Sequence, residues 1–468
     1  MSDLPSFQSC NDNISDDRAQ SGSTDSSDNF RDECNRLIHY YRSVRKNSLT
    51  LAAPLSHEDW MLQSMPDASP IKWHLAHITW FFETFLLKPH LNAYKVFDPN
   101  FGFLFNSYYQ QIGEMHARPQ RGLLSRPTAT QILNYRNYVD QKMEILLGNL
   151  TPERFPDIKA LVNLGCAHEE QHQELMQTDI LHALSQNAML PAAYEAKTGM
   201  QDYPCHGGAT QWISFEGGLV ETGAKEICKD QNEKPEGGRE FAFDNEYPSH
   251  QYYLNPFELA SRPVTNREYL EFIEDGGYRD HRPWLSDGWA FVQREKWNAP
   301  LYWRYTDDEG WLQFTLFGER PLSLDAPVRH VSYYEAAAYA SWAGVYLPTE
   351  TEWEVAAASS SQEKDGHFLS EGTPSLWEKD INCKQGTSPR LSAMFGHVWE
   401  WTASPYTAYP GYKPAAGAIG EYNGKFMSSQ MVLRGGSCAT PQGHVRSTYR
   451  NFFPPHARWQ FSGFRLAR

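Results

Sequence analysis

The segment His168-Glu-Glu-Gln-His172-Gln-Glu174 limits most strongly what this chain can fold into. It lies within a predicted helix over 157–184. A helix turns about 100° per residue, so His168 and His172 share one face and their imidazoles converge. Two imidazoles held in this way form half of a metal site. The segment therefore predicts a helical domain with a metal-binding face.

The same residues allow three interpretations. His168-Glu169-x-x-His172 matches the zinc-protease pattern, in which Glu169 is the general base. His168-x3-His172-x-Glu174 also matches a non-haem iron pattern. A polar helix face can, in addition, carry histidines that bind no metal. The segment alone leaves all three interpretations open.

Composition narrows the class of protein. The net charge of −15 argues against a nucleic-acid partner, which favours a basic surface. No apolar run is long enough to span a bilayer and no N-terminal apolar leader is visible, so we expect a cytoplasmic enzyme with no membrane partner. The seven cysteines are odd in number and widely spread, which is typical of reduced thiols.

The chain divides into four predicted parts. Residues 1–30 are rich in Ser and Asp and predict a disordered acidic tail. Residues 31–185 predict four helices with one long connection over 88–127, a bundle whose core could hold a metal. Residues 186–210 predict a linker. Residues 211–468 alternate short segments with turns, and one helix is expected there at 332–342, with a capping box at its start.

Helix boundaries in the first half follow from their caps. A helix is predicted to start near Ser69-Pro70, and another to run from Thr128 to Gly148. The first of these carries His74 and His77, either of which could complete a three-histidine site. Glu174 lies off the main histidine face, where it is either a hydrogen-bond partner of the site or an ordinary surface carboxylate.

Further candidates lie in the long connection and near the C-terminus. A tyrosine beside a metal can donate a proton, and Tyr108 and Tyr109 point in different directions, so at most one faces a given site. An arginine can clamp a carboxylate, and Arg118 and Arg121 follow. The paired phenylalanines Phe452 and Phe453 are either core residues or part of a cage for a quaternary ammonium group.

Ordered motifs in the second half resemble the formylglycine-generating-enzyme (sulfatase-modifying) domain, a variant of the C-type lectin fold. They are Arg262-Pro-Val-Thr-Asn-Arg-Glu-Tyr269, Val331-Ser-Tyr-Tyr-Glu-Ala336, Leu347-Pro-Thr-Glu-Thr-Glu-Trp-Glu354, Gly396-His-Val-Trp-Glu-Trp401, Leu433-Arg-Gly-Gly-Ser437 and Ser462-Gly-Phe-Arg465. The first half resembles a DinB-like four-helix bundle. The expected fold class is therefore α+β. Together the halves, over about 35–468, resemble the ergothioneine-biosynthesis sulfoxide synthases of the EgtB type.

This resemblance implies an enzyme that uses Fe(II) and O2 to join a thiol to C2 of the imidazole of hercynine, the trimethyl betaine of histidine. It implies iron ligands at His77, His168 and His172. His74 is not expected to be a ligand, because His77 is the residue that matches the family's L-x-H position. Gln171 would contact the hercynine imidazole. Asn451 would hold the carboxylate region, and Phe452 and Phe453 would lie near the trimethylammonium group.

Members of the family differ in the thiol substrate that they use. Users of γ-glutamylcysteine carry Asn-Trp-Asp where this chain has Asn451-Phe452-Phe453. The tandem tyrosines instead resemble a bacterial subgroup that can take free cysteine, so cysteine is the expected donor. In that subgroup Arg118 would clamp the thiol's carboxylate, with Arg121 as second choice. Tyr109, or failing that Tyr108, would donate the proton or hydrogen atom that activated oxygen requires.

Related activities are less consistent with the sequence. Formylglycine-generating enzymes need a cysteine pair, and Cys438 stands alone in its region. Ovothiol-type synthases, which act on histidine, often carry a fused methyltransferase domain, for which no room is left after the last motif. A zinc metalloprotease would not account for the lectin-like half, although His182 could supply a downstream ligand.

Overall fold

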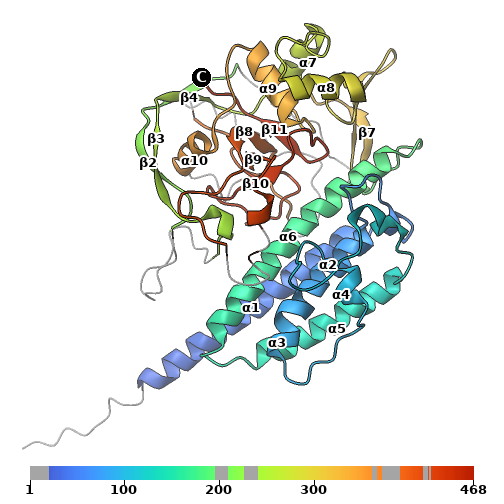
Figure 1. The fold of residues 1–468 in the computed structure, drawn as a ribbon, viewed down its shortest axis with the longest axis vertical. Coiled ribbons are helices and arrows are strands. Elements are labelled where there is room, and N and C mark those ends of the chain that lie inside the picture. The colour runs from blue at the N-terminus through green and yellow to red at the C-terminus, as the bar shows by residue number, and fades with distance from the viewer. Residues whose placement is uncertain are drawn as a thin grey trace, which may run out of the picture.

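The computed structural model describes residues 21–195, 209–225, 241–360, 366–370, 390–414, 420 and 423–468. Its first half is helical and its second half mixes short strands and helices, which confirms the predicted α+β class (Figure 1). Among the described helices, none is both long and apolar enough to cross a membrane.

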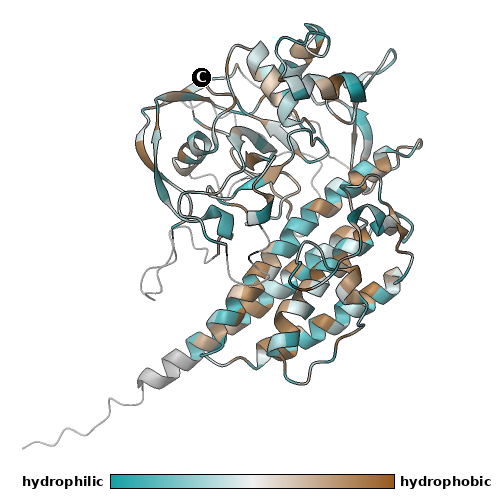
Figure 2. Cartoon of the chain, in the orientation of Figure 1, coloured by the Kyte–Doolittle hydropathy of each residue, from teal (hydrophilic) through white to brown (hydrophobic). Residues whose placement is uncertain are grey.

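Four long helices make up most of the helical half: α1 (Ser21–Ala52), α2 (Ile71–Phe82), α5 (Ala129–Gly148) and α6 (Phe155–Ser185). Helix α1 packs against α6, and α2 packs against both α5 and α6. Figure 2 shows apolar and polar residues alternating along α1 and α6, as expected for helices with one buried face. Thr128 caps α5 through a capping box, as its sequence predicts.

The long connection contains short turns of helix. The chain leaves α2 through a π-helical turn (Glu83–Leu87) and passes through α3 (Lys88–His90), α4 (Phe101–Leu104) and a 3₁₀ turn (Arg118–Leu123). The connection is folded onto the bundle, because its Phe101, Phe105 and Tyr109 belong to the helical core.

The second half is built on a four-stranded sheet with the order β10-β9-β8-β11. Its strands are β8 (Trp399–Pro405), β9 (Met431–Arg434), β10 (Asn451–Phe453) and β11 (Ser462–Phe464). Strands β8 and β11 are parallel and the other pairs are antiparallel. Smaller sheets pair β1 (Trp212–Phe215) with β4 (Phe257–Ala260), β2 (Gly218–Thr222) with β3 (His250–Leu254), and β6 (Gly310–Thr315) with β5 (Trp303–Thr306) and β7 (Gly318–Pro321).

The second half contains more helix than predicted. The expected capping box starts α9 (Tyr333–Trp342) at Ser332. Three further helices are present: α7 (Asn266–Glu274), α8 (Ser286–Glu295) and α10 (Glu350–Ala358). Helices α7 and α10 have 9 residues each and begin with capping boxes at Thr265 and Thr349, the same signal that predicted α9, so the sequence offered a signal for both. Helix α8 has 10 residues and no side-chain cap.

Two predicted boundaries need correction. Helix α1 begins at Ser21, so residues 21–30 of the predicted 1–30 tail are helical, and Phe30 packs edge-on against Phe155 at 5.5 Å. Residues 1–20 lie outside the described part. In the predicted 186–210 linker, the amides of Ala193 and Tyr194 both donate to the Leu316 carbonyl, and the Tyr194 hydroxyl donates to Leu51. These contacts attach its first part to both halves, while residues 196–208 are not described.

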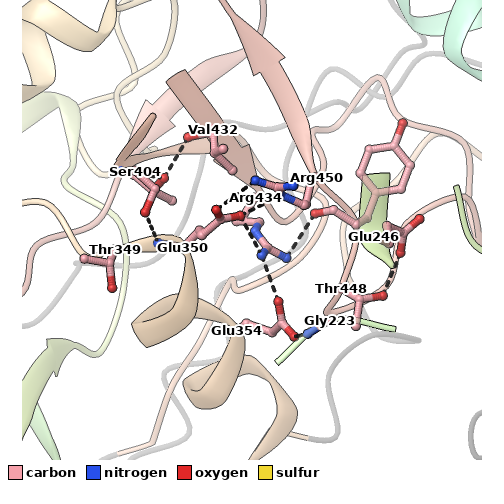
Figure 3. A network of polar contacts seen from close by, with 12 residues as sticks. Gly223, Glu246, Thr349, Glu350, Glu354, Ser404, Val432, Arg434, Thr448 and Arg450 are labelled. Carbon is pink, nitrogen blue, oxygen red and sulfur yellow. Dashed lines mark hydrogen bonds and ion pairs between the residues drawn. The ribbon is translucent and has the colours of Figure 1, made fainter. Parts of the chain in front are cut away.

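The segment before β10 is held by a buried ion-pair network (Figure 3). Glu350 accepts from Arg450 (2.8 and 2.9 Å) and from Arg434 (3.0 Å). Burial alone raises the pKa of Glu350, but the two guanidinium groups hold it below its usual value. Arg434 also donates to Glu354 at 2.8 Å and to the Ser447 carbonyl at 2.8 Å. The network therefore fixes the position of the backbone that leads into β10.

Candidate metal centre

Three buried histidines from two helices converge on one point. His77 comes from α2, and His168 and His172 from successive turns of α6. One ring nitrogen from each lies within 4.8 Å of those of the other two, and no other such group occurs among the described residues. Burial lowers the pKa of His168 to about 3 and the pKa values of His77 and His172 well below their usual value. The three imidazoles are therefore neutral at pH 7, the form that binds a metal.

Neighbouring groups orient two of these rings. His77 Nδ1 lies 2.6 Å from the Phe105 carbonyl, which can only accept, so Nε2 is its ligand atom. His172 Nδ1 lies 2.7 Å from His74 Nδ1, and His74 Nε2 lies 3.0 Å from Asp179 Oδ2. A carboxylate–imidazole–imidazole chain thus directs His172. His74 belongs to this chain and lies outside the three-histidine group.

Asp179 was not predicted from the sequence. It lies seven residues after His172, which places both on one face of α6. That spacing could have revealed it. Its carboxylate also accepts the Ser69 amide at 2.7 Å, at the start of α2, so it joins the two ligand-bearing helices.

We expect Asp179→Asn to weaken metal binding by about 10- to 100-fold while the fold persists, because the amide no longer polarises His74 toward His172. Metal affinity measured by competition with a chelator checks this. Asp157→Asn, at an exposed position in the first turn of the same helix, is the matched control. Equal affinities for the two variants would contradict the orienting role of Asp179.

The histidines open into a cavity of about 390 Å³ between the two halves of the molecule. It is lined by every residue that the sequence assigned to substrate or proton transfer: Tyr108, Tyr109, Arg118, Arg121, Gln171, Asn451, Phe452 and Phe453. Residues separated by more than 300 positions thus meet beside the histidines, because α6 lies along the second half (Figure 1). Gln171 donates to the Tyr449 hydroxyl across this boundary at 2.6 Å.

Arg121 is a buried cation in the cavity wall. It is 3% exposed, and its guanidinium lies 3.4 Å from the centre of the Trp73 ring. It donates to the hydroxyls of Ser69 (2.9 Å) and Ser107 (3.3 Å), and no carboxylate among the described residues forms an ion pair with it. Burial and the neighbouring Arg118 lower its pKa to about 9. The wall is therefore suited to an anionic ligand.

The two tyrosines have different surroundings. Tyr109 is buried, with its ring 5.7 Å from Trp80 and 5.2 Å from Phe85. The Tyr108 hydroxyl accepts from Arg118 at 2.8 Å, and the Tyr108 ring meets Phe426 of the second half edge-on at 4.9 Å. Tyr109 therefore lies on the side of the ligand-bearing helix α2, and Tyr108 on the side of the other half.

Aromatic residues of the second half form a further part of the cavity lining, called here the aromatic wall. Phe452 stacks on Tyr406 at 4.0 Å and lies 5.9 Å from Phe426. Phe453 meets Trp459 edge-on at 6.1 Å. Phe452 and Phe453 are only half-buried, so their rings remain available to a ligand.

Two of the three glutamates in the segment His168–Glu174, Glu169 and Glu174, have structural partners. Glu169 is fully buried and pairs with Arg45 (2.8 Å) and Arg136. It is absent from the cavity lining, and so cannot serve as a protease general base. Glu174 accepts from Trp399 (2.8 Å), Ser437 (2.5 Å) and Thr440 (2.6 Å) of the second half. It is therefore neither a surface carboxylate nor a partner of the histidines.

His182, the downstream ligand that a zinc protease would need, lies away from the three histidines. Its Nδ1 is 2.6 Å from the Ser64 hydroxyl, and it does not line the cavity. The zinc-protease interpretation is therefore wrong at both its base and its third ligand.

Comparison with known proteins agrees with this architecture. Residues 40–176 match the DinB superfamily, and residues 201–468 match the sulfatase-modifying factor enzyme 1-like domain. The hercynine oxygenase of Mycolicibacterium smegmatis is 32% identical over 86% of this chain and 92% of that protein. That of Mycolicibacterium thermoresistibile is 30% identical over 86% and 88%, respectively. The match to that of Mycobacterium tuberculosis, 37% identical, spans 48% of this chain and 56% of that protein. The chain therefore belongs to the hercynine oxygenase family.

Proposed function

We propose that this protein is an Fe(II)- and O2-dependent sulfoxide synthase of ergothioneine biosynthesis that joins cysteine to C2 of the hercynine imidazole. One observation carries the proposal: three neutral histidines line a single cavity whose wall also contains Arg118 and Arg121 and the half-buried rings of Phe452 and Phe453. This arrangement suits a metal flanked by one anionic and one quaternary ammonium substrate.

The histidines fit an Fe(II) ion. His77, His168 and His172 would bind it through neutral nitrogens, and three protein ligands leave positions for substrates. When bound, iron would supply O2 activation and would lower the pKa of the thiol. The remaining tasks, which are orienting both substrates and transferring protons, fall to the residues of the cavity wall.

For hercynine, Gln171 and β10 provide the recognition. The hydrogen bond to Tyr449 fixes the amide plane of Gln171, and we assign its carbonyl oxygen to the imidazole N–H. The trimethylammonium group would lie against Phe452 and Phe453, with a cation–π attraction of about 0.5–2 kcal/mol. Asn451 would hold the carboxylate. Its own side chain accepts from the Phe452 amide at 2.9 Å, which orients it beside the aromatic wall.

For the thiol substrate, we assign the carboxylate to Arg121 together with Arg118. A ligand carboxylate would supply the direct ion-pair contact that Arg121 does not make among the described residues, where its side-chain partners are the hydroxyls of Ser69 and Ser107. Cysteine is favoured over γ-glutamylcysteine because position 453 is a phenylalanine and offers no carboxylate to a γ-glutamyl amino group.

Anaerobic loading with Fe(II), followed by O2 and hercynine with either cysteine or γ-glutamylcysteine, tests the proposal by mass analysis. The expected product is the hercynine–cysteine sulfoxide, formed faster than its γ-glutamyl counterpart. Histidine in place of hercynine provides the test for an ovothiol-type activity. Failure to form a sulfoxide with either thiol would overturn the assignment.

We expect Tyr109→Phe to shift the product from the sulfoxide toward cysteine sulfinate, because oxygen that receives no proton in time is added to the thiol alone. The ratio of the two products, measured by mass analysis at equal iron loading, checks this. Tyr138→Phe removes a hydroxyl that donates to the Lys95 carbonyl away from the cavity and should not change the ratio. If Tyr108→Phe gives the shift and Tyr109→Phe does not, the donor is Tyr108.

A further inference from the structure

A chain of hydrogen bonds leads away from Gln171 on the side opposite the arginines. Gln171 donates to the Tyr449 hydroxyl at 2.6 Å, and that hydroxyl lies 3.2 Å from His444 Nε2. His444 Nδ1 lies 2.8 Å from Glu170 Oε2, and Glu170 Oε1 accepts from Tyr40 at 3.2 Å. Tyr449, His444 and Glu170 are all buried. The order of hydroxyl, imidazole and carboxylate is the one by which a hydroxyl is coupled to a base.

His444 separates two cavities. It lines the cavity of the three histidines, and it also lines a second cavity of about 370 Å³ that is bounded by residues of α1 and α6. The second cavity is lined by charged groups from α1 and α6, among them half-buried Glu33 and exposed Arg36. A proton on His444 therefore has a route to solvent that does not pass the metal centre.

The proposed reaction must release a proton from the imidazole ring. A thiol, an imidazole C–H and O2 give a C–S(=O) bond and one water, which balances in atoms and electrons without another reductant. When sulfur bonds to C2, the hydrogen of C2 leaves as a proton and its electron pair returns to the ring. Tyr109 is assigned to supply a proton to oxygen, so a separate group must accept this one.

We propose that the Tyr449 hydroxyl accepts the C2 proton while passing its own proton to His444, which delivers it to solvent through the second cavity. This inference rests on the proposed function and adds a proton acceptor to it. Tyr449 is the residue that would touch substrate, and His444 acts through it.

The contacts support this direction of transfer. The Glu170 carboxylate can only accept, so His444 carries its proton on Nδ1 and presents Nε2 as an acceptor to Tyr449. Burial raises the pKa of Tyr449, so the phenol stays protonated and acts as a relay. Two hydrogen bonds hold the backbone at Tyr449 in place. Arg434 donates to the Tyr449 carbonyl, and the neighbouring Thr448 donates to Glu246 at 2.7 Å (Figure 3).

The charged and titratable groups around His444 come from several elements. Glu170 and Lys159 lie on α6, Glu33, Arg36 and Tyr40 lie on α1, and Arg446 and Tyr449 lie on the same segment as His444.

The test compares wild type, His444→Gln and Tyr449→Phe with C2-protiated and C2-deuterated hercynine. Each variant should form sulfoxide about 100-fold more slowly. The isotope effect should exceed that of the wild type, because removal of the C2 proton becomes slower. The double variant should be no slower than the slower single variant, since both residues serve one path. His397→Gln, a buried histidine of the same half that lines neither cavity, is the matched control.

The outcomes separate the relay from the proposed function. Lack of sulfoxide from the wild type would overturn the function and the relay with it. A wild type that forms sulfoxide, with an unchanged rate and isotope effect in His444→Gln, would overturn the relay alone. Iron content and thermal unfolding of each variant show whether a slower rate reflects damage to the site, and Tyr449→Phe keeps the ring packing if His444→Gln does not fold.

Discussion

Replacing His168 by alanine is expected to abolish sulfoxide formation and to weaken iron binding by more than about 100-fold, the upper range for removing a group that only orients a ligand. His168 is 1% exposed and supplies one of the three converging nitrogens, so no solvent-exposed group can take its place. Iron content after gel filtration and product formation by mass analysis measure the two effects. The loss should be larger than in Asp179→Asn, whose ligands all remain.

His182→Ala is the matched control for this experiment. It removes a histidine from the same helix, 14 residues further on, whose Nδ1 contacts Ser64. Iron content and turnover should stay at the wild-type level. Loss of metal from His182→Ala, with retention in His168→Ala, would contradict the centre as assigned.

Replacing Glu169 by alanine is expected to destabilise the fold by about 3–5 kcal/mol, because the buried guanidinium of Arg136 loses its ion-pair partner and that of Arg45 keeps only Asp140. Glu169 is 0% exposed, and its partners Arg45 and Arg136 are 3% and 1% exposed. The free energy of unfolding in urea measures the effect. Glu144→Ala provides the contrast: its pair with Arg42 is 46% and 59% exposed, so its loss should cost about 0–1 kcal/mol.

The pH dependence of unfolding gives a second measure of Glu169. Burial alone raises its pKa, but Arg136 and Arg45 lower it to about 2. A carboxyl whose folded pKa is depressed binds fewer protons in the folded state. Its contribution to stability is therefore present above the unfolded pKa of about 4.3 and is lost as the pH falls toward 2. Glu169→Ala should flatten this part of the stability curve, and an unchanged slope would contradict the buried ion pair.

Local sequence signals were sufficient for much of the framework. The capping boxes at Thr128 and Ser332 start helices where predicted, because a cap depends on residues only three positions apart. The pair His168 and His172 also depends on helical spacing alone. The short helices α7 and α10 were missed although capping boxes at Thr265 and Thr349 mark their starts, whereas α8 has no side-chain cap to mark its start.

The roles of neighbouring glutamates could not be predicted in this way. Glu169, Glu170 and Glu174 lie within one short stretch of α6, yet they contact Arg45 on α1, His444 near β10 and Trp399 on β8, respectively. The partner of each glutamate depends on which element packs against its face of the helix. Helical spacing predicts which residues share a face, but it does not predict which element packs there.

By itself, the sequence determined the helical half, the lectin-like half, the histidine pair and the family to which the chain belongs, because these depend on short-range spacing and on ordered motifs. Only the tertiary structure decided that His74 orients His172, that Glu169 pairs with arginines and that His444 lies between two cavities. These contacts join residues from 33 to 274 positions apart. They exist because packing α6 between the two halves buries polar groups, and each buried polar group must find a partner there.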